Sequence, residues 1–116
     1  MRRAYPELSR VARVINSPIE DAIRTFAARQ FDVVFSMAVL EHVHPSSNWV
    51  LPEIARVVRK LLITIEDEVG VSRRHVPRNY QSVFEPLGLR QVEVVNCREV
   101  EGLGADFNAR VFEAKR

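Results

Sequence analysis

Cysteine, glycine and long apolar runs are scarce in this chain of 116 residues. It has one cysteine, Cys97, and four glycines, the first at position 70. A lone cysteine excludes an internal disulfide and fits a reducing compartment, so we expect a cytoplasmic protein. No apolar run reaches the roughly 20 residues of a membrane-spanning helix. Because Met1-Arg2-Arg3 leads into Ala4-Tyr5-Pro6-Glu7, there is also no apolar signal-peptide core, and we expect no membrane association.

Lysine is nearly absent, and the overall charge is close to balanced. The chain carries 17 cationic and 15 acidic residues, for a net charge of +2. This balance argues against a nucleic-acid-binding module, which would need a dense basic field, so we expect no nucleic-acid partner. Hydrophobic residues make up 47% and charged residues 28%, as in soluble globular proteins. The length fits one domain over residues 1–116.

Helix-like and strand-like patterns alternate along the chain. Ser17-Pro18-Ile19-Glu20 predicts a helix start with a capping box, in which the side chains of Ser17 and Glu20 each accept the backbone N–H of the other residue. The nearly all-apolar run from Phe31 to Val39 predicts a strand buried on both faces. The other predicted strands are Ala12–Ile15, Leu61–Ile65, Leu89–Val95 and Phe107–Ala114. Further helices are predicted from residues 49–51, with Val58 and Leu61 on the apolar face, and around Tyr80–Leu87.

This alternation predicts the fold class. Strands that alternate with helices form a parallel sheet covered by helices, so we expect an α/β protein. The last two strands, Leu89–Val95 and Phe107–Ala114, are too close in sequence for a helical crossover. They are therefore expected to be antiparallel.

The segment Phe31-Asp32-Val33-Val34-Phe35-Ser36-Met37-Ala38-Val39-Leu40-Glu41-His42 resembles the fourth strand and following loop of class I S-adenosylmethionine-dependent methyltransferases. Leu51–Val57 resembles the helix that follows in that family, and Ala4–Leu8 the end of its second helix. The resemblance implies a Rossmann-like sheet with a C-terminal antiparallel pair and S-adenosylmethionine as cofactor. It also implies that Phe31–Met37 runs parallel to Leu61–Ile65, and that Phe107–Ala114 lies between Leu61–Ile65 and Leu89–Val95.

Two family signatures are missing from the sequence. The family has a Gly-rich loop after its first strand and an acidic residue after its second, and the glycines at 70, 88, 102 and 104 lie outside any such loop. The chain therefore resembles roughly the C-terminal half of a methyltransferase, a single partial domain with an incomplete sheet. We expect it to be inactive alone. A truncated gene product, a domain fragment and a decayed copy all remain open as origins.

The resemblance also implies site residues. The segment after the third family strand, with Ser17 and Ile19, would contact adenine, although Pro18 lacks the N–H that the family often uses there. A plain helix cap is the alternative role for Ser17. The positions implied to bind the cofactor are Ser17, Ile19, Ser36, Met37, Ala38, Val39 and His42. His42 is also the one weak candidate for a catalytic base, and we favour a role as a wall of the site.

Acceptor and metal contacts are less clearly indicated. By resemblance, Glu66, Arg78 and Tyr80 are weak candidates for substrate contacts, with a charged surface as the alternative. His42 and His44, beside Glu41, could begin a metal site. No further ligands follow at a recognisable spacing, since His75 and Cys97 are distant in sequence, so no metal is predicted. A small-molecule or sugar-type acceptor is expected for the parent enzyme.

Two other function classes stay open. The chain could be a non-enzymatic interaction module or subunit derived from the methyltransferase fold, or an unrelated small α/β regulatory domain. The first family strand would pair with the strand that begins at Phe31. Without it, that strand has an open edge, which invites pairing with another chain. We therefore expect self-association, or covering of the edge by Ala12–Ile15.

Overall fold

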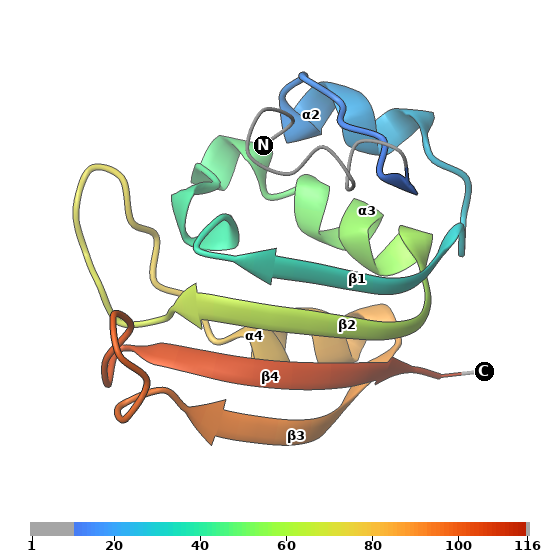
Figure 1. The fold of residues 1–116 in the computed structure, drawn as a ribbon. Coiled ribbons are helices and arrows are strands. Elements are labelled where there is room, and N and C mark those ends of the chain that lie inside the picture. The colour runs from blue at the N-terminus through green and yellow to red at the C-terminus, as the bar shows by residue number, and fades with distance from the viewer. Residues whose placement is uncertain (1–10, 116) are drawn as a thin grey trace.

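The computed structural model describes residues 11–115, which form a four-stranded mixed sheet with helices on one side (Figure 1). The strands are β1 (Phe31–Met37), β2 (Val58–Asp67), β3 (Leu89–Asn96) and β4 (Phe107–Ala114). Their order is β1-β2-β4-β3. β1 runs parallel to β2, and β4 is antiparallel to both of its neighbours. The predicted α/β class and strand order are confirmed.

The helical segments are short. They are α2 (Ile19–Ala22), η1 (Ile23–Thr25), η2 (Leu40–His42), η3 (Pro45–Ser47), α3 (Val50–Val57), α4 (Tyr80–Phe84) and η4 (Glu85–Leu87). The prediction that Val58 and Leu61 belong to the second helix is wrong, because β2 begins at Val58 directly after α3. Across residues 11–115, no helix is long and apolar enough to cross a bilayer.

One face of the sheet carries the core. Leu62 of β2 and Phe112 of β4 are fully buried there, and the Phe112 ring packs against Phe84 of α4 with ring centroids 5.6 Å apart. Ile54 of α3 and Ile23 of η1 belong to the same apolar cluster. The helices thus lie on one side of the strands, and Figure 1 shows α4 behind them.

The other face of the sheet is open at β1. Val33, Phe35 and Met37 point to this face and keep 51%, 71% and 50% of their surface exposed. The prediction that this strand is buried on both faces is therefore wrong. The apolar run predicts burial, but β1 is an edge strand and no helix among residues 11–115 covers its second face.

The segment before β1 also differs from expectation. Residues 12–16 form no strand and do not pair with β1, so its edge is bare in the part of the chain that the structure describes. The capping box is wrong too, because the helix begins at Ile19 with Pro18 as its N-cap. The N–H groups of Asp21 and Ala22 donate to the Pro18 carbonyl, both at 3.0 Å. Ser17 lies one residue too early to cap.

Candidate functional site

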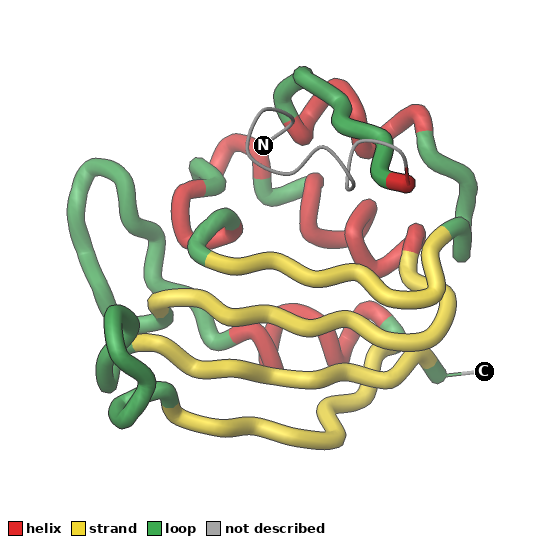
Figure 2. Tube along the Cα trace, in the orientation of Figure 1, coloured by secondary structure: helices red, strands yellow, loops and turns green. Residues whose placement is uncertain are grey.

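The carboxyl ends of β1 and β2 lie side by side, and three connections gather at that end of the sheet (Figure 2). They are residues 38–49 after β1, 68–79 after β2 and 97–106 between β3 and β4. In open α/β sheets, ligands bind just beyond the carboxyl ends of parallel strands. The candidate site is therefore sought here.

Glu66, near the end of β2, holds the turn that follows β1. Its side chain is fully buried, and its Oε1 accepts hydrogen bonds from the N–H groups of Val39 at 2.9 Å and Glu41 at 3.1 Å. Ala38 lies in the left-handed region, with φ of 54°. Its N–H donates to the Ile65 carbonyl at 2.9 Å. The path of residues 38–41 is thus set by the end of β2.

Four buried side-chain oxygens have no hydrogen-bond partner among residues 11–115: Ser36 Oγ, Thr64 Oγ1, Glu66 Oε2 and Tyr80 Oη. Such atoms are rare in folded proteins. Burial raises the pKa of the Glu66 carboxyl, and the nearby Ser36 hydroxyl and backbone N–H groups offset only part of that rise. Burial, and secondarily the negative charge of Glu66, raises the pKa of Tyr80. Both groups are therefore held toward their neutral forms.

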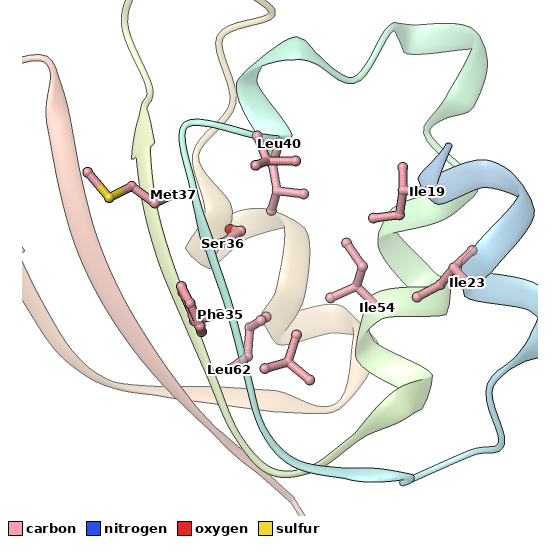
Figure 3. Close-up of a pocket in the computed structure, with 10 residues that line it drawn as sticks. Ile19, Ile23, Phe35, Ser36, Met37, Leu40, Ile54 and Leu62 are labelled. Atoms are coloured by element: carbon pink, nitrogen blue, oxygen red, sulfur yellow. The ribbon is translucent and has the colours of Figure 1, made fainter. Parts of the chain in front are cut away.

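A cavity of about 300 Å³ opens along the free edge of β1, between that strand and the helices above it (Figure 3). Nine of its ten lining residues are apolar, and Ser36 supplies the one hydroxyl. Phe35 and Met37 are among these residues, although their side chains point to the open face of the sheet. Ile19 and Ile23 approach it from α2 and η1, and Ile54 from α3. This lining suits apolar groups better than the charged and hydroxylated parts of a nucleoside cofactor.

Four of the seven positions implied to bind the cofactor line this cavity: Ile19, Ser36, Met37 and Val39. Ser17, Ala38 and His42 do not. Ser17 is exposed, and its hydroxyl donates to the Pro18 carbonyl at 3.3 Å. The structure thus gathers Ser36, Met37, Val39 and Ile19 in one place, with Ser17, Ala38 and His42 outside it.

The three weak substrate candidates lie behind the turn. Glu66 and Tyr80 are fully buried. The guanidinium of Arg78 donates to the carbonyls of Leu40 at 2.8 Å and Val43 at 2.7 Å, and to Asn48 Oδ1 at 2.6 Å. Their surroundings favour a role in shaping the site over direct contact with an acceptor.

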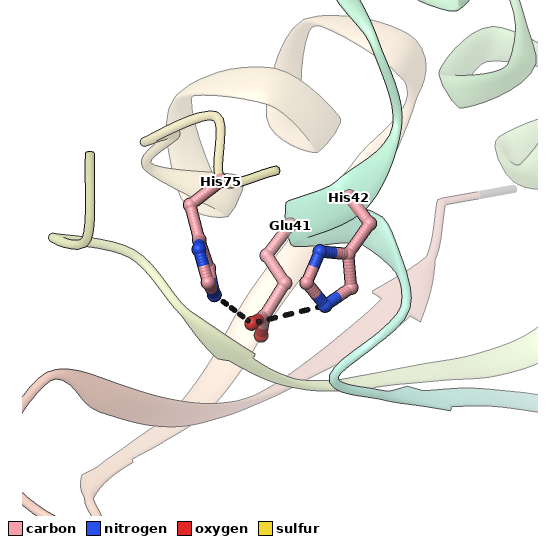
Figure 4. Close-up of side chains that lie close together, drawn as sticks. All are labelled: Glu41, His42 and His75. Atoms are coloured by element: carbon pink, nitrogen blue, oxygen red, sulfur yellow. Dashed lines mark ion pairs between the residues drawn. The ribbon is translucent and has the colours of Figure 1, made fainter. Parts of the chain in front are cut away.

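A second group of side chains meets at the turn after β1 (Figure 4). Glu41 is 3% exposed, and its Oε2 lies 3.5 Å from His42 Nε2 and 3.1 Å from His75 Nε2. Glu41 Oε1 accepts the N–H of Asp67 at 2.9 Å. His44 is not part of this cluster, because its Nδ1 pairs with the Ser46 hydroxyl at 2.8 Å. Sequence spacing indicated His42 with His44, whereas the fold joins His42 to His75 of a distant loop.

Comparison with known proteins places this geometry in a family. The model of the methyltransferase domain family matches residues 1–61, more than half of the chain. No curated protein matches. Among solved structures, a SAM-dependent methyltransferase from Archaeoglobus fulgidus is 12% identical with a TM-score of 0.66, over 86% of this chain and 66% of that one.

Two other solved structures are similar. The 1,6-didemethyltoxoflavin-N1-methyltransferase of Burkholderia thailandensis, solved with S-adenosylhomocysteine, is 13% identical with a TM-score of 0.72, over 97% of this chain and 56% of that one. The DszA carbon methyltransferase is 16% identical with a TM-score of 0.70, over 99% of this chain and 37% of that one. The chain thus spans two thirds or less of the length of these structures. On its fold and its family match, the chain belongs to the methyltransferase domain family.

Proposed function

We propose that this chain supplies one part of an S-adenosylmethionine-dependent methyltransferase domain, the wall of the cofactor site formed by Ser36–Val39 and Ile19. The observation that carries the proposal is the turn after β1, fixed at the carboxyl edge of two parallel strands by the buried Glu66. Ligands of open α/β sheets bind at this edge. The family match and the relative solved with S-adenosylhomocysteine support S-adenosylmethionine as the ligand proposed for this wall.

The wall is only part of a cofactor site. In residues 11–115, the cavity beside it offers a single hydroxyl, Ser36, and no charged side chain. A ligand with a sulfonium, a carboxylate and ribose hydroxyls needs polar partners for each, and burying unpaired polar groups is costly. Binding still carries most of its entropy cost, roughly 4 kcal/mol or more. The chain alone should therefore bind the cofactor no better than about millimolar, near −4 kcal/mol, and show no turnover.

Isothermal titration of the 116-residue chain with S-adenosylmethionine tests this proposal. We expect no saturable binding in the micromolar range and no methyl transfer. Micromolar affinity would contradict it, because a complete set of polar contacts would then have to come from this chain.

The acceptor is proposed to be a small molecule. The Burkholderia relative was solved with 1,6-didemethyltoxoflavin. With a net charge of +2, the chain lacks the dense positive field that nucleic-acid acceptors need. The acceptor atom is left open by this argument.

A second candidate function is an interaction module, favoured by the bare β1 strand. Among residues 11–115, no strand pairs with the outer edge of β1, and this edge and the exposed Phe35 form a surface that a second copy of the chain could cover. Exposed apolar edge strands pair readily with other chains. Sedimentation velocity at rising concentration should show association of the unmodified chain and loss of it in Phe35→Glu. Val71→Glu, at an 80% exposed loop residue, is the matched control and should associate normally. A chain that stays monomeric at high concentration would contradict this function.

A further inference from the structure

Three side chains with metal-ligating atoms converge beside the turn after β1. Glu41 Oε2 lies 3.5 Å from His42 Nε2 and 3.1 Å from His75 Nε2. The ligating atoms of all three residues lie within 4.8 Å of one another (Figure 4). Two imidazole nitrogens and one carboxylate oxygen are a ligand set that Zn²⁺ uses in proteins when it keeps its fourth position open.

The spacing suits one ion between these atoms. Metal–ligand distances of roughly 2.0–2.1 Å at tetrahedral angles separate ligand atoms by roughly 3.3 Å. The two distances from the carboxylate of Glu41, at 3.1 and 3.5 Å, bracket that value. The side chains of His42 and His75 are 45% and 33% exposed, so both rings have room to close on an ion.

The atoms behind the ligands orient them. His42 Nδ1 lies 2.5 Å from the Arg74 carbonyl oxygen, which can only accept, so Nδ1 carries the proton and Nε2 of the neutral ring presents its lone pair. His75 Nδ1 lies 2.8 Å from Ser72 Oγ. Histidine ligands of metals usually have such a partner at their second nitrogen.

Glu41 is prepared in the same way. Its Oε1 accepts the Asp67 N–H at 2.9 Å, which leaves Oε2 to face the two rings. The Glu41 side chain is nearly inaccessible to water, and a buried carboxylate needs a positive partner. We propose that Glu41, His42 and His75 bind a divalent transition-metal ion of the zinc type, with a fourth position open to water or to an acceptor atom. This inference does not rest on cofactor binding.

The first test is a calorimetric titration of the metal-free 116-residue chain with Zn²⁺. We expect one ion per chain. Loss of a partner behind a ligand typically weakens metal binding 10–100-fold, so removing a ligand in His42→Ala or His75→Ala should weaken it on the order of 100-fold or more. His44→Ala is the matched control, since His44 lies on the same stretch but pairs with Ser46, and it should bind as the unmodified chain does.

Histidine NMR of the unmodified chain, with diamagnetic Zn²⁺ as the probe, keeps the test decisive if a variant fails to fold. Zn²⁺ should shift the ring nitrogen signals of His42 and His75 together and leave those of His44 near their free positions. Circular dichroism checks each variant. Absence of Zn²⁺ binding below millimolar concentration would overturn the proposal. So would equal binding in folded His75→Ala, or perturbation of His44 with His75 unaffected.

Discussion

Glu41 and Glu66 each hold the backbone beside the other. Glu66 Oε1 accepts the N–H of Glu41 at 3.1 Å, and Glu41 Oε1 accepts the N–H of Asp67, the residue after Glu66, at 2.9 Å. This reciprocal pairing joins the turn after β1 to the end of β2. One oxygen of Glu41 remains for the histidine cluster, while the second oxygen of Glu66 is buried without a hydrogen-bond partner among residues 11–115. The two parts of the candidate site thus share one support.

Glu66→Ala should destabilise the fold strongly. The change leaves the N–H groups of Val39 and Glu41 without their acceptor and opens a cavity at a fully buried position. We expect a loss of about 2–4 kcal/mol in the free energy of unfolding, measured by chemical denaturation. Glu113→Ala is the control, because its ion pair with Arg90 is more than half exposed and worth about 0–1 kcal/mol. Equal losses in the two variants would refute the anchoring role.

The protonation of Glu66 should make stability depend on pH. Burial raises the pKa of this carboxyl in the folded chain above the ordinary value of 4.5. The folded state therefore favours the protonated form, and this contribution is fully present below pH 4.5 and lost as the pH rises through the raised pKa. Glu66→Gln removes this dependence. The difference in unfolding free energy between the two chains should shift in favour of the variant as pH rises, and a flat difference would show that Glu66 titrates normally.

Arg78 should be needed for the shape of the turn. Its guanidinium joins the carbonyls of Leu40 and Val43 to Asn48. Arg78→Ala should lower the free energy of unfolding by about 2–4 kcal/mol. Hydrogen bonds from a charged donor contribute about 1.5–3 kcal/mol each, and their contributions are not additive. Arg78→Lys should recover only part, because an ammonium lacks the planar fork. Arg59→Ala is the control, because the ion pair of Arg59 is exposed. Its free energy of unfolding, measured by chemical denaturation, should change by at most about 1 kcal/mol. A fully stable Arg78→Lys would argue against the fork geometry.

The ion pair of Arg110 and Glu68 is nearly buried and doubly hydrogen-bonded, with both N–O distances at 2.8 Å. Arg110→Leu alone should lower the free energy of unfolding by about 3–5 kcal/mol, because Glu68 is then left as a buried charge without a partner. The double variant Arg110→Leu/Glu68→Leu should regain most of that loss. A double-mutant cycle by thermal and chemical unfolding measures the coupling, and additive effects would show that the two residues act independently.

Much of the sheet could be predicted from the sequence, because its strands coincide with apolar runs between turns. The order of β4 between β2 and β3 came from the family resemblance and is confirmed. The open face of β1 could not be predicted, since an apolar run shows only that a face can be covered, not that something covers it. Ser17 illustrates a second limit, because a shift of the helix start by one residue removes its capping role.

The candidate site was only partly predictable. Ser36, Met37 and Val39 follow one strand, so a local pattern found them together. Glu41 and His75 come from separate connections, and only the parallel pairing of β1 with β2 brings those connections to one end of the sheet. The burial of Glu66 and the clamp by Arg78 are equally long-range. Neighbouring acids and a basic loop look like solvated surface in sequence, so no local signal pointed to these contacts.

NMR titration of the isotope-labelled chain with S-adenosylhomocysteine tests the central claim most directly, because it maps binding even at millimolar affinity. The account predicts weak, fast-exchange shifts concentrated at Ile19 and at the backbone of Ser36, Met37, Ala38 and Val39, with β3 and its loop unaffected. Shifts confined to other surfaces, or no shift at these residues when the ligand reaches several millimolar, would contradict the claim that this edge of the sheet is a wall of the cofactor site.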